Sequence, residues 1–208
     1  MKVLVAGATG LVGSEVVKAL LQRGAEVRAF TRKQPKAGTF PGAVEIALGD
    51  LSDPVSVAEA MKGVHKLFPL IGTENVPVEL TQALYAYGLA KKAGLKHVTY
   101  VSVYKADQFL EVPHFANKFA IEEAIRVGGV PYTILRPAYF AQNERRLKPE
   151  LTGLGVSHHD GSIKPQSRFR VIPGNELFDG VLVAPTGMRR RQRIEHSFSV
   201  LVIVRSAA

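Results

Sequence analysis

GATGLVGS, at residues 7–14, decides the fold class of this chain. It places Gly7, Gly10 and Gly13 at three-residue spacing. Without a Cβ atom, glycine can make a tight turn, let a pyrophosphate approach the backbone, and let a helix pack closely on a strand. The same triplet also fits an ordinary turn with no ligand, so the flanking sequence has to decide between the two.

The flanking sequence predicts a β-α-β unit around these glycines. Residues 3–6 are apolar and β-branched, as in a parallel strand that is covered on both faces. Residues 11–23 repeat apolar side chains at helical spacing, Gly24 ends that pattern, and residues 25–31 predict a second strand. The free N–H groups of the first helical turn would face an anion. We therefore predict that the turn binds the phosphates of a nucleotide.

The alternation of strands and helices continues for about 140 residues. The predicted strands are residues 3–6, 26–30, 44–48, 66–70, 97–101 and 132–135, and the predicted helices are residues 11–23, 54–61, 77–93 and 115–127. Six strands joined in this way predict an α/β fold, with a doubly wound, mainly parallel sheet of Rossmann type and helices on both faces. We expect this NAD(P)-binding domain to cover residues 1–150.

The remaining residues, 151–208, do not continue the alternation. Residues 158–180 are polar and rich in turn formers, while residues 181–185 and 197–204 are two possible strands. We expect a small irregular C-terminal extension here, a divergent or truncated segment that makes an incomplete substrate lobe.

Composition excludes several classes of protein. The 208 residues contain no cysteine, which excludes disulfides and thiolate metal sites and fits a reducing compartment. No apolar run is long enough to span a membrane, so we expect a cytoplasmic protein. The net charge of +9 raises the question of nucleic acid, but the densest basic run, Arg189–Arg191 with Arg193, is short and typical of a solvated surface. Nucleic-acid binding is therefore disfavoured.

The end of the second predicted strand indicates which dinucleotide is preferred. An acidic residue at this place accepts hydrogen bonds from the ribose of NAD, whereas a basic residue takes the 2′-phosphate of NADP. The strand ends AFTRKQPKAG, with no acid and with Arg32, Lys33 and Lys36 instead. The arginine guanidinium suits phosphate oxygens. We predict a preference for NADP(H) over NAD(H). The alternative is that these basic residues form an ordinary surface loop that binds no phosphate.

Five segments in order resemble the NmrA-like family of atypical short-chain dehydrogenase/reductases. They are GATGLVG at residue 7, LGDLSDP at 48–54, AKKAGLKHVTYVS at 90–102, PHFANKFAIEEAIR at 113–126 and PYTILRPAYFAQN at 131–143. The resemblance covers about the first 150 residues and implies a Rossmann fold that binds NADP(H). The residues after 150 depart from the usual continuation of this family, which builds a substrate lobe.

The resemblance also implies roles for individual residues. The pyrophosphate would lie on the glycine turn and the first helical turn, and Arg32 would bind the 2′-phosphate. The other implied residues, from Asp50 onward, would border the adenine, the ribose and the nicotinamide. The implied cofactor-binding residues are Gly7, Thr9, Gly10, Leu11, Val12, Gly13, Arg32, Asp50, Leu51, Leu70, Ile71, Gly72, Lys118, Pro137 and Tyr139.

Three residues are candidates for chemistry. Classical short-chain reductases use a tyrosine and a lysine four residues later; here His114 stands in the tyrosine position and Lys118 in the lysine position. One helical turn separates the two, so they share a helix face. Lys118 could instead pair with Glu122 on a solvated helix, and His114 could simply begin a helix. Ser102, after the fifth strand, is a third candidate, with an ordinary strand-end hydroxyl as its alternative.

Two functions follow from these candidates. The first is an NADPH-dependent reductase of a quinone, enone or carbonyl compound, in which Lys118 or His114 stabilises or protonates the developing oxyanion. The second is a catalytically silent NADP(H)-sensing regulator that acts through a protein partner, because the tyrosine is missing. The sequence leaves open whether the chain forms a homodimer.

Overall fold

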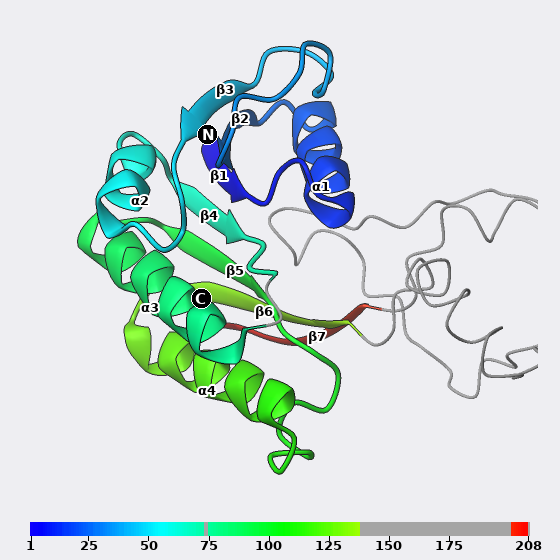
Figure 1. Cartoon of the computed structure of the whole chain (residues 1–208), viewed down its shortest axis with the longest axis vertical. Helices are drawn as coiled ribbons and strands as arrows, with labels where there is room; N and C mark the ends of the chain where they lie inside the picture. The colour runs from blue at the N-terminus through cyan, green and yellow to red at the C-terminus, as the bar shows by residue number, and fades with distance from the viewer. Residues whose placement is uncertain (73–74, 138–200, 208) are drawn as a thin grey trace, which may run out of the picture. The chain divides into compact units, whose positions relative to one another are not determined.

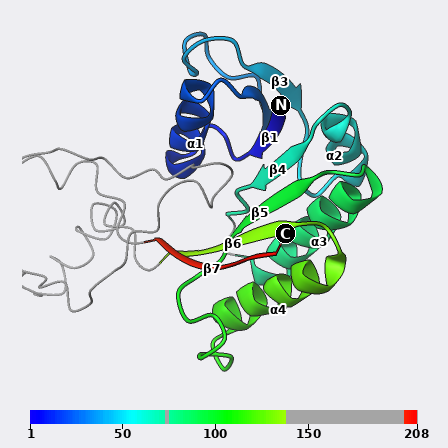
Figure 2. The ribbon, with the colours of Figure 1, turned by 180° about the vertical axis from the view of Figure 1, so that it is seen from behind.

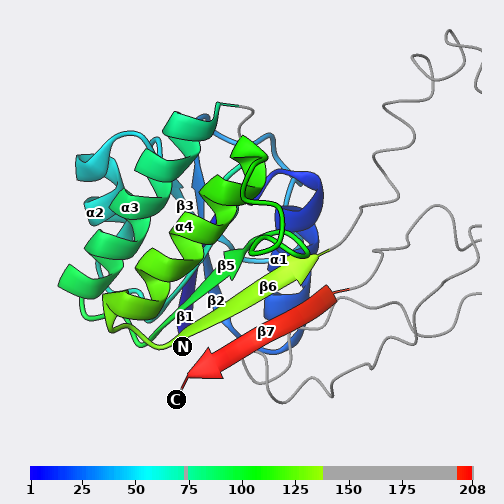
Figure 3. The same ribbon diagram turned by 90° about the horizontal axis from the view of Figure 1, so that it is seen from below.

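The computed structural model describes residues 1–72, 75–137 and 201–207 of the chain. Its centre is a seven-stranded sheet with the spatial order β3-β2-β1-β4-β5-β6-β7. The strands are β1 (Lys2–Ala6), β2 (Glu26–Thr31), β3 (Glu45–Leu48), β4 (Lys66–Pro69), β5 (His97–Val101), β6 (Tyr132–Pro137) and β7 (Leu201–Ala207). The pairs among β1 to β6 are parallel, and Figure 3 shows β7 running against β6 at the edge. The predicted mainly parallel sheet is confirmed.

In the described part of the chain, four helices cover the two faces of the sheet. They are α1 (Leu11–Gln22), α2 (Pro54–Met61), α3 (Val76–Lys92) and α4 (Pro113–Gly128). In Figures 1 and 2, α2, α3 and α4 lie side by side, and α1 lies on the other side of the strands. Helices on both faces are thereby confirmed, and the Rossmann-type fold with them.

The core explains why the inner strands are rich in apolar residues. All six residues of β6 and four of the five in β1 are buried, as expected for parallel strands with both faces covered. The helices contribute buried side chains on one face, which in α3 are mostly small. The core includes Leu4, Leu67, Val98 and Ile134 from the sheet, Ala83, Ala86 and Ala90 from α3, and Ile121 from α4.

The chain divides into two compact units. The first comprises Met1–Arg136 and Val202–Ala208, and the second, Pro137–Leu201, lies almost entirely outside the described residues. The predicted boundary at residue 150, the polar stretch at 158–180, the possible strand at 181–185 and the arginine run at 189–193 all fall outside them too. β7 overlaps the second possible strand, at residues 197–204, and ends three residues later. No helix in the described part of the chain is both long and apolar enough to cross a membrane.

Candidate cofactor site

The first two glycines of the predicted cradle make the turn that follows β1. Gly7 has φ of +69°, and a Cβ atom there would lie 2.9 Å from both the Cβ and the carbonyl oxygen of Leu70. The N–H of Gly10 donates to the carbonyl oxygen of Gly7 at 3.0 Å, which closes the turn. Gly7 therefore satisfies both a left-handed backbone and a close approach to the segment after β4.

The third glycine lets α1 pack against this turn. A Cβ atom at Gly13 would overlap the carbonyl oxygen of Gly7 and lie 2.8 Å from its carbonyl carbon and 2.9 Å from Cα of Ala8. Gly13 is itself buried, whereas Leu11 is exposed and Val12 half-buried. The three glycines thus perform the two structural roles that a dinucleotide-binding turn requires, the tight turn and the close helix–strand contact.

No side chain in the described part of the chain caps the N-terminus of α1. Its N-cap residue is Gly10, which makes no side-chain hydrogen bond, and its first turn contains no acidic residue. By contrast, the side chains of Asp53 and Asn75 cap α2 and α3, whereas α4, like α1, has no side-chain cap among the described residues. The free N–H groups of α1 and its helix dipole are therefore suited to an anion.

A cavity of about 440 Å³ lies at the carboxyl ends of β1, β2, β3 and β4. Of the predicted cofactor-binding residues, the cavity is lined by Gly7, Thr9, Arg32, Asp50, Leu51, Leu70 and Gly72. The sheet order β3-β2-β1-β4 makes β1 the strand at which the chain reverses direction across the sheet. Ligands of open α/β sheets bind at such a switch point, outside the carboxyl ends of the strands.

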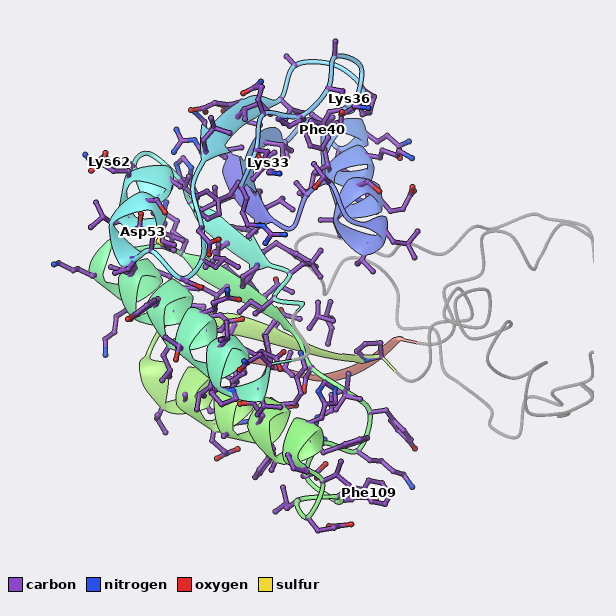
Figure 4. All side chains as sticks on the ribbon, viewed as in Figure 1. Lys33, Lys36, Phe40, Asp53, Lys62 and Phe109 are labelled. Carbon is purple, nitrogen blue, oxygen red and sulfur yellow. The ribbon has the colours of Figure 1, made fainter. Side chains whose placement is uncertain are left out.

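The rim of the cavity carries the residues that would distinguish nucleotides. Arg32 is exposed, lines the cavity, and makes no ion pair within the part of the chain that the structure describes. The hydroxyl of Thr31 donates to the carbonyl oxygen of Lys33 at 3.0 Å, which orders the backbone around Arg32. Figure 4 shows Lys33 and Lys36 on the segment that follows β2. The guanidinium of Arg32 is therefore available to a phosphate.

Asp50 lies across the cavity, on the segment after β3. Its carboxylate accepts a hydrogen bond from the N–H of Ser52 at 2.8 Å, and its backbone N–H donates to Oγ of Ser56 at 3.1 Å. Oγ of Ser52 in turn accepts from the side-chain amide of Gln82, in α3, at 2.9 Å. These bonds hold the segment with Asp50 and Leu51 in place beside the cavity.

A second polar cluster lies at the carboxyl end of β5. Lys118, in α4, is buried; its ammonium forms an ion pair with Oε1 of Glu79 at 2.5 Å and donates to the carbonyl oxygen of Val101 at 3.2 Å. The next residue in the chain is Ser102, which is 5% exposed and whose hydroxyl has no hydrogen-bond partner among the described residues. A buried hydroxyl without a partner is costly, and those of Tyr87, Thr99 and Tyr100 share this state among the described residues; the Ser102 hydroxyl can bind a ligand oxygen.

His114 and Lys118 both lie on α4, one helical turn apart as the sequence predicts, but they differ in burial. α4 begins at Pro113 rather than Phe115, so His114 lies in its first turn, exposed, with its ring edge-on to that of Phe115 at 5.9 Å. Lys118 does not pair with Glu122, the alternative that the sequence left open. The carboxylate of Glu122 binds Arg136 and Arg126 instead.

Two predicted residues near the sheet's centre are buried, and one is not described. Ile71, after β4, is 8% exposed, and Pro137 is the buried last residue of β6. Tyr139 lies outside the described residues.

Sequence reasoning missed Glu79 and Asn117. Oε2 of Glu79 accepts a hydrogen bond from the side-chain amide of Asn117 at 2.8 Å, and both residues are buried. A signal for Glu79 exists, since it lies at helical spacing on the same stripe as Ala83, Ala86 and Ala90. A carboxylate on a buried stripe requires a partner.

Together these features fit a dinucleotide. The cradle has no room for a Cβ atom at Gly7 or Gly13, and no described side chain caps the start of α1. The cavity lies at the switch point, and Ser102, whose hydroxyl has no partner among the described residues, follows the residue whose carbonyl Lys118 contacts.

Comparison with known proteins agrees with this geometry. The chain is 29% identical over 165 residues to the photosystem II assembly factor Ycf39 of Trieres chinensis, covering 75% of this chain and 52% of that protein. It is 30% identical over 144 residues to the NAD(P)H azoreductase of Xenophilus azovorans, covering 68% and 49%. The structure of the NADPH-dependent quinone oxidoreductase of Escherichia coli in complex with NADPH matches with a TM-score of 0.65 at 25% identity, covering 74% and 55%.

The chain spans about half the length of the curated relatives it matches. The model of the NmrA-like family matches residues 1–160, which include the glycine turn, the cavity and the cluster around Lys118. The chain belongs to the NmrA-like family.

Proposed function

We propose that this chain is an NADP(H)-dependent reductase. The observation that carries the proposal is the glycine turn, in which Gly7 and Gly13 leave no space for a Cβ atom and Gly7 lines a cavity at the switch point of the sheet. The azoreductase and the quinone oxidoreductase, both reductases by name, support the same activity. When bound, the nicotinamide cofactor supplies a hydride.

The residues that line the cavity would hold the adenosine half of the cofactor. The N–H groups at the start of α1 would bind the pyrophosphate, and the Arg32 guanidinium would bind the 2′-phosphate. Asp50 and Leu51 would border the adenine. Since no acidic residue ends β2, the ribose hydroxyls that NAD presents there would lack their usual acceptor, which favours NADP(H) over NAD(H).

The cluster after β5 would act on the acceptor and on the nicotinamide half. The ammonium of Lys118 has three N–H donors, two of which bind Glu79 and Val101, so one is left for a ligand oxygen. The buried hydroxyl of Ser102 would donate to the same ligand. Donors fixed in a site with little water stabilise the negative charge that develops on a carbonyl or quinone oxygen during reduction. A quinone, an enone or another carbonyl compound is therefore the substrate class.

A turnover assay tests the reductase. NADPH oxidation is followed with 1,4-benzoquinone as the acceptor, for the wild type, for Ser102→Ala, and for Thr39→Ala as a control on an exposed turn. We expect turnover in the wild type and in the control, and a kcat lower by about tenfold or more in Ser102→Ala, because one donor to the developing oxyanion is lost. Absence of NADPH oxidation with quinones and enones alike would contradict the reductase.

The second candidate is an NADP(H)-binding regulator without turnover. The observation that favours it is the exposure of His114, which leaves the position of the classical tyrosine without a buried proton donor. An assembly factor among the relatives is consistent with action through a protein partner. Tight NADPH binding without oxidation by any of these acceptors would favour the regulator.

A further inference from the structure

The ammonium of Lys118 is held more rigidly than a helix-surface lysine. Its side chain is 9% exposed, and it reaches Glu79 at 2.5 Å and the carbonyl oxygen of Val101 at 3.2 Å. The same nitrogen lies 5.2 Å from the ring centre of Tyr100. Three contacts from α3 and β5 thus define one position for this group.

The carboxylate of Glu79 is itself fixed from two directions. Glu79 is 2% exposed, and it lies in the first turn of α3, which Asn75 caps through a hydrogen bond to the N–H of Val78. One of its oxygens faces Lys118, and the other accepts from the side-chain amide of Asn117 at 2.8 Å. Because both oxygens are engaged by consecutive residues of α4, the carboxylate cannot rotate without losing a bond.

Helix packing alone does not account for this arrangement. Burying an ion pair costs several kcal/mol of desolvation, and apolar side chains of similar size would join α3 to α4 at least as well. α4 is already tied to the sheet by a separate buried pair, Glu122 with Arg136, at 2.7 and 2.8 Å. The pair of Glu79 and Lys118 lies instead at the end of β5, where Lys118 contacts the carbonyl oxygen of Val101, the residue before Ser102.

We infer that Glu79 is the positioning residue for Lys118: with Asn117 as its support, it holds the Lys118 ammonium against the Val101 carbonyl so that the third N–H is presented to the cofactor ribose. The inference rests on the proposed function, since it assigns to Lys118 a ligand within that site. Glu79 touches neither substrate nor cofactor, and it acts only through Lys118.

A double-mutant cycle on NADPH affinity tests the inference. The dissociation constant of NADPH is measured by titration for the wild type, Glu79→Gln, Lys118→Met and the double variant, with Glu123→Gln as an exposed control on α4 and thermal unfolding recorded for each. We expect Glu79→Gln to weaken binding by about tenfold, because a misplaced ammonium loses its contact. In the Lys118→Met background, Glu79→Gln should not raise the dissociation constant of NADPH further.

The outcomes separate this inference from the proposed function. If the wild type binds neither NADPH nor NADH, the proposed function fails. Suppose that the wild type binds NADPH. The inference on Glu79 alone is overturned if the folded Glu79→Gln variant binds NADPH equally well, or if the substitution weakens binding to the same extent with and without Lys118. If Glu79→Gln does not fold, Asn117→Ala decides: it leaves the ion pair and frees one carboxylate oxygen, and we expect weaker binding that again depends on Lys118. Unchanged binding in folded Asn117→Ala would then overturn the inference.

Discussion

At the scale of single residues, the cradle depends on glycine because two of its positions have no space for a side chain. Gly7 and Gly13 are the two positions where the structure leaves no space for a Cβ atom beside the turn, one against Leu70 and the other against Gly7. The sequence predicted both constraints, because a glycine triplet between a strand and a helix is a local pattern. The same local logic predicted Arg32 at the end of β2.

Gly13→Ala should destabilise the protein and weaken nucleotide binding. The added methyl group would overlap the Gly7 carbonyl, and overpacking of this kind costs about 1–3 kcal/mol, more than the gain of about 1 kcal/mol from replacing a helical glycine. Chemical denaturation measures the difference in the free energy of unfolding.

Gly88→Ala is the matched control, since Gly88 lies inside α3 and a Cβ atom there would meet no described atom within 4 Å. We expect this variant to be more stable than the wild type by about 0.5–1 kcal/mol. Equal effects of the two substitutions would contradict the packing role of Gly13.

The residues that the sequence did not predict depend on contacts that are distant in the chain. Glu79 meets Lys118 and Asn117 across α3 and α4, almost 40 residues apart, and no local pattern selects this pair. For the same reason the sequence suggested Glu122 as the partner of Lys118, because it lies one helical turn away. In the structure, Glu122 is taken by Arg136 from β6.

At the scale of elements, capping residues, glycines and prolines in the sequence predicted most of the helix and strand boundaries. The predicted ranges of β5 and α2 agree with the structure, and α2 begins where Asp53 and Pro54 predict. α4 begins two residues earlier than predicted, because Pro113 occupies its first turn, where its missing N–H costs nothing. This shift places His114 on the exposed first turn. β6 extends to Pro137, two residues beyond its predicted end.

β5 also carries a histidine, His97, whose protonation opposes folding. Burial, with a smaller contribution from the charge of Lys66, lowers the pKa of His97 from 6.5 to about 4. A ring nitrogen of His97 lies 2.9 Å from the hydroxyl of Thr133 on the neighbouring strand. The folded protein therefore favours neutral His97.

Stability should fall as the pH drops from 6.5 to 4. In this window the unfolded chain binds a proton at His97 that the folded chain does not, so the free energy of unfolding decreases by an amount on the order of 1–2 kcal/mol after solvent screening. Denaturation curves recorded across this range for the wild type and for His97→Gln measure the effect, which should be smaller in the variant. Identical pH dependence in the two proteins would show that His97 is not its source.

At the scale of the whole molecule, the sheet order determines where a ligand can bind. β1 lies between β2 and β4, and the four strands of this half end around one cavity. The cluster of Glu79, Lys118 and Ser102 lies at the end of β5, two places along the sheet from β1. Figure 4 shows Phe109 on the segment between β5 and α4, far from the labelled Lys36 on the segment after β2. The alternation of strands and helices predicted this layout, because parallel strands all end at one edge of the sheet.

The measurement that tests the account most directly is a calorimetric titration of the full chain with NADPH and with NADH. We expect NADPH to bind more tightly than NADH, and Arg32→Ala to remove most of that difference while Lys36→Ala, on the same segment but outside the cavity, changes it little. This result would establish the glycine turn as a dinucleotide cradle and Arg32 as the residue that selects the phosphate. Binding of neither dinucleotide by the folded wild type would contradict the cradle, and the proposed reductase with it.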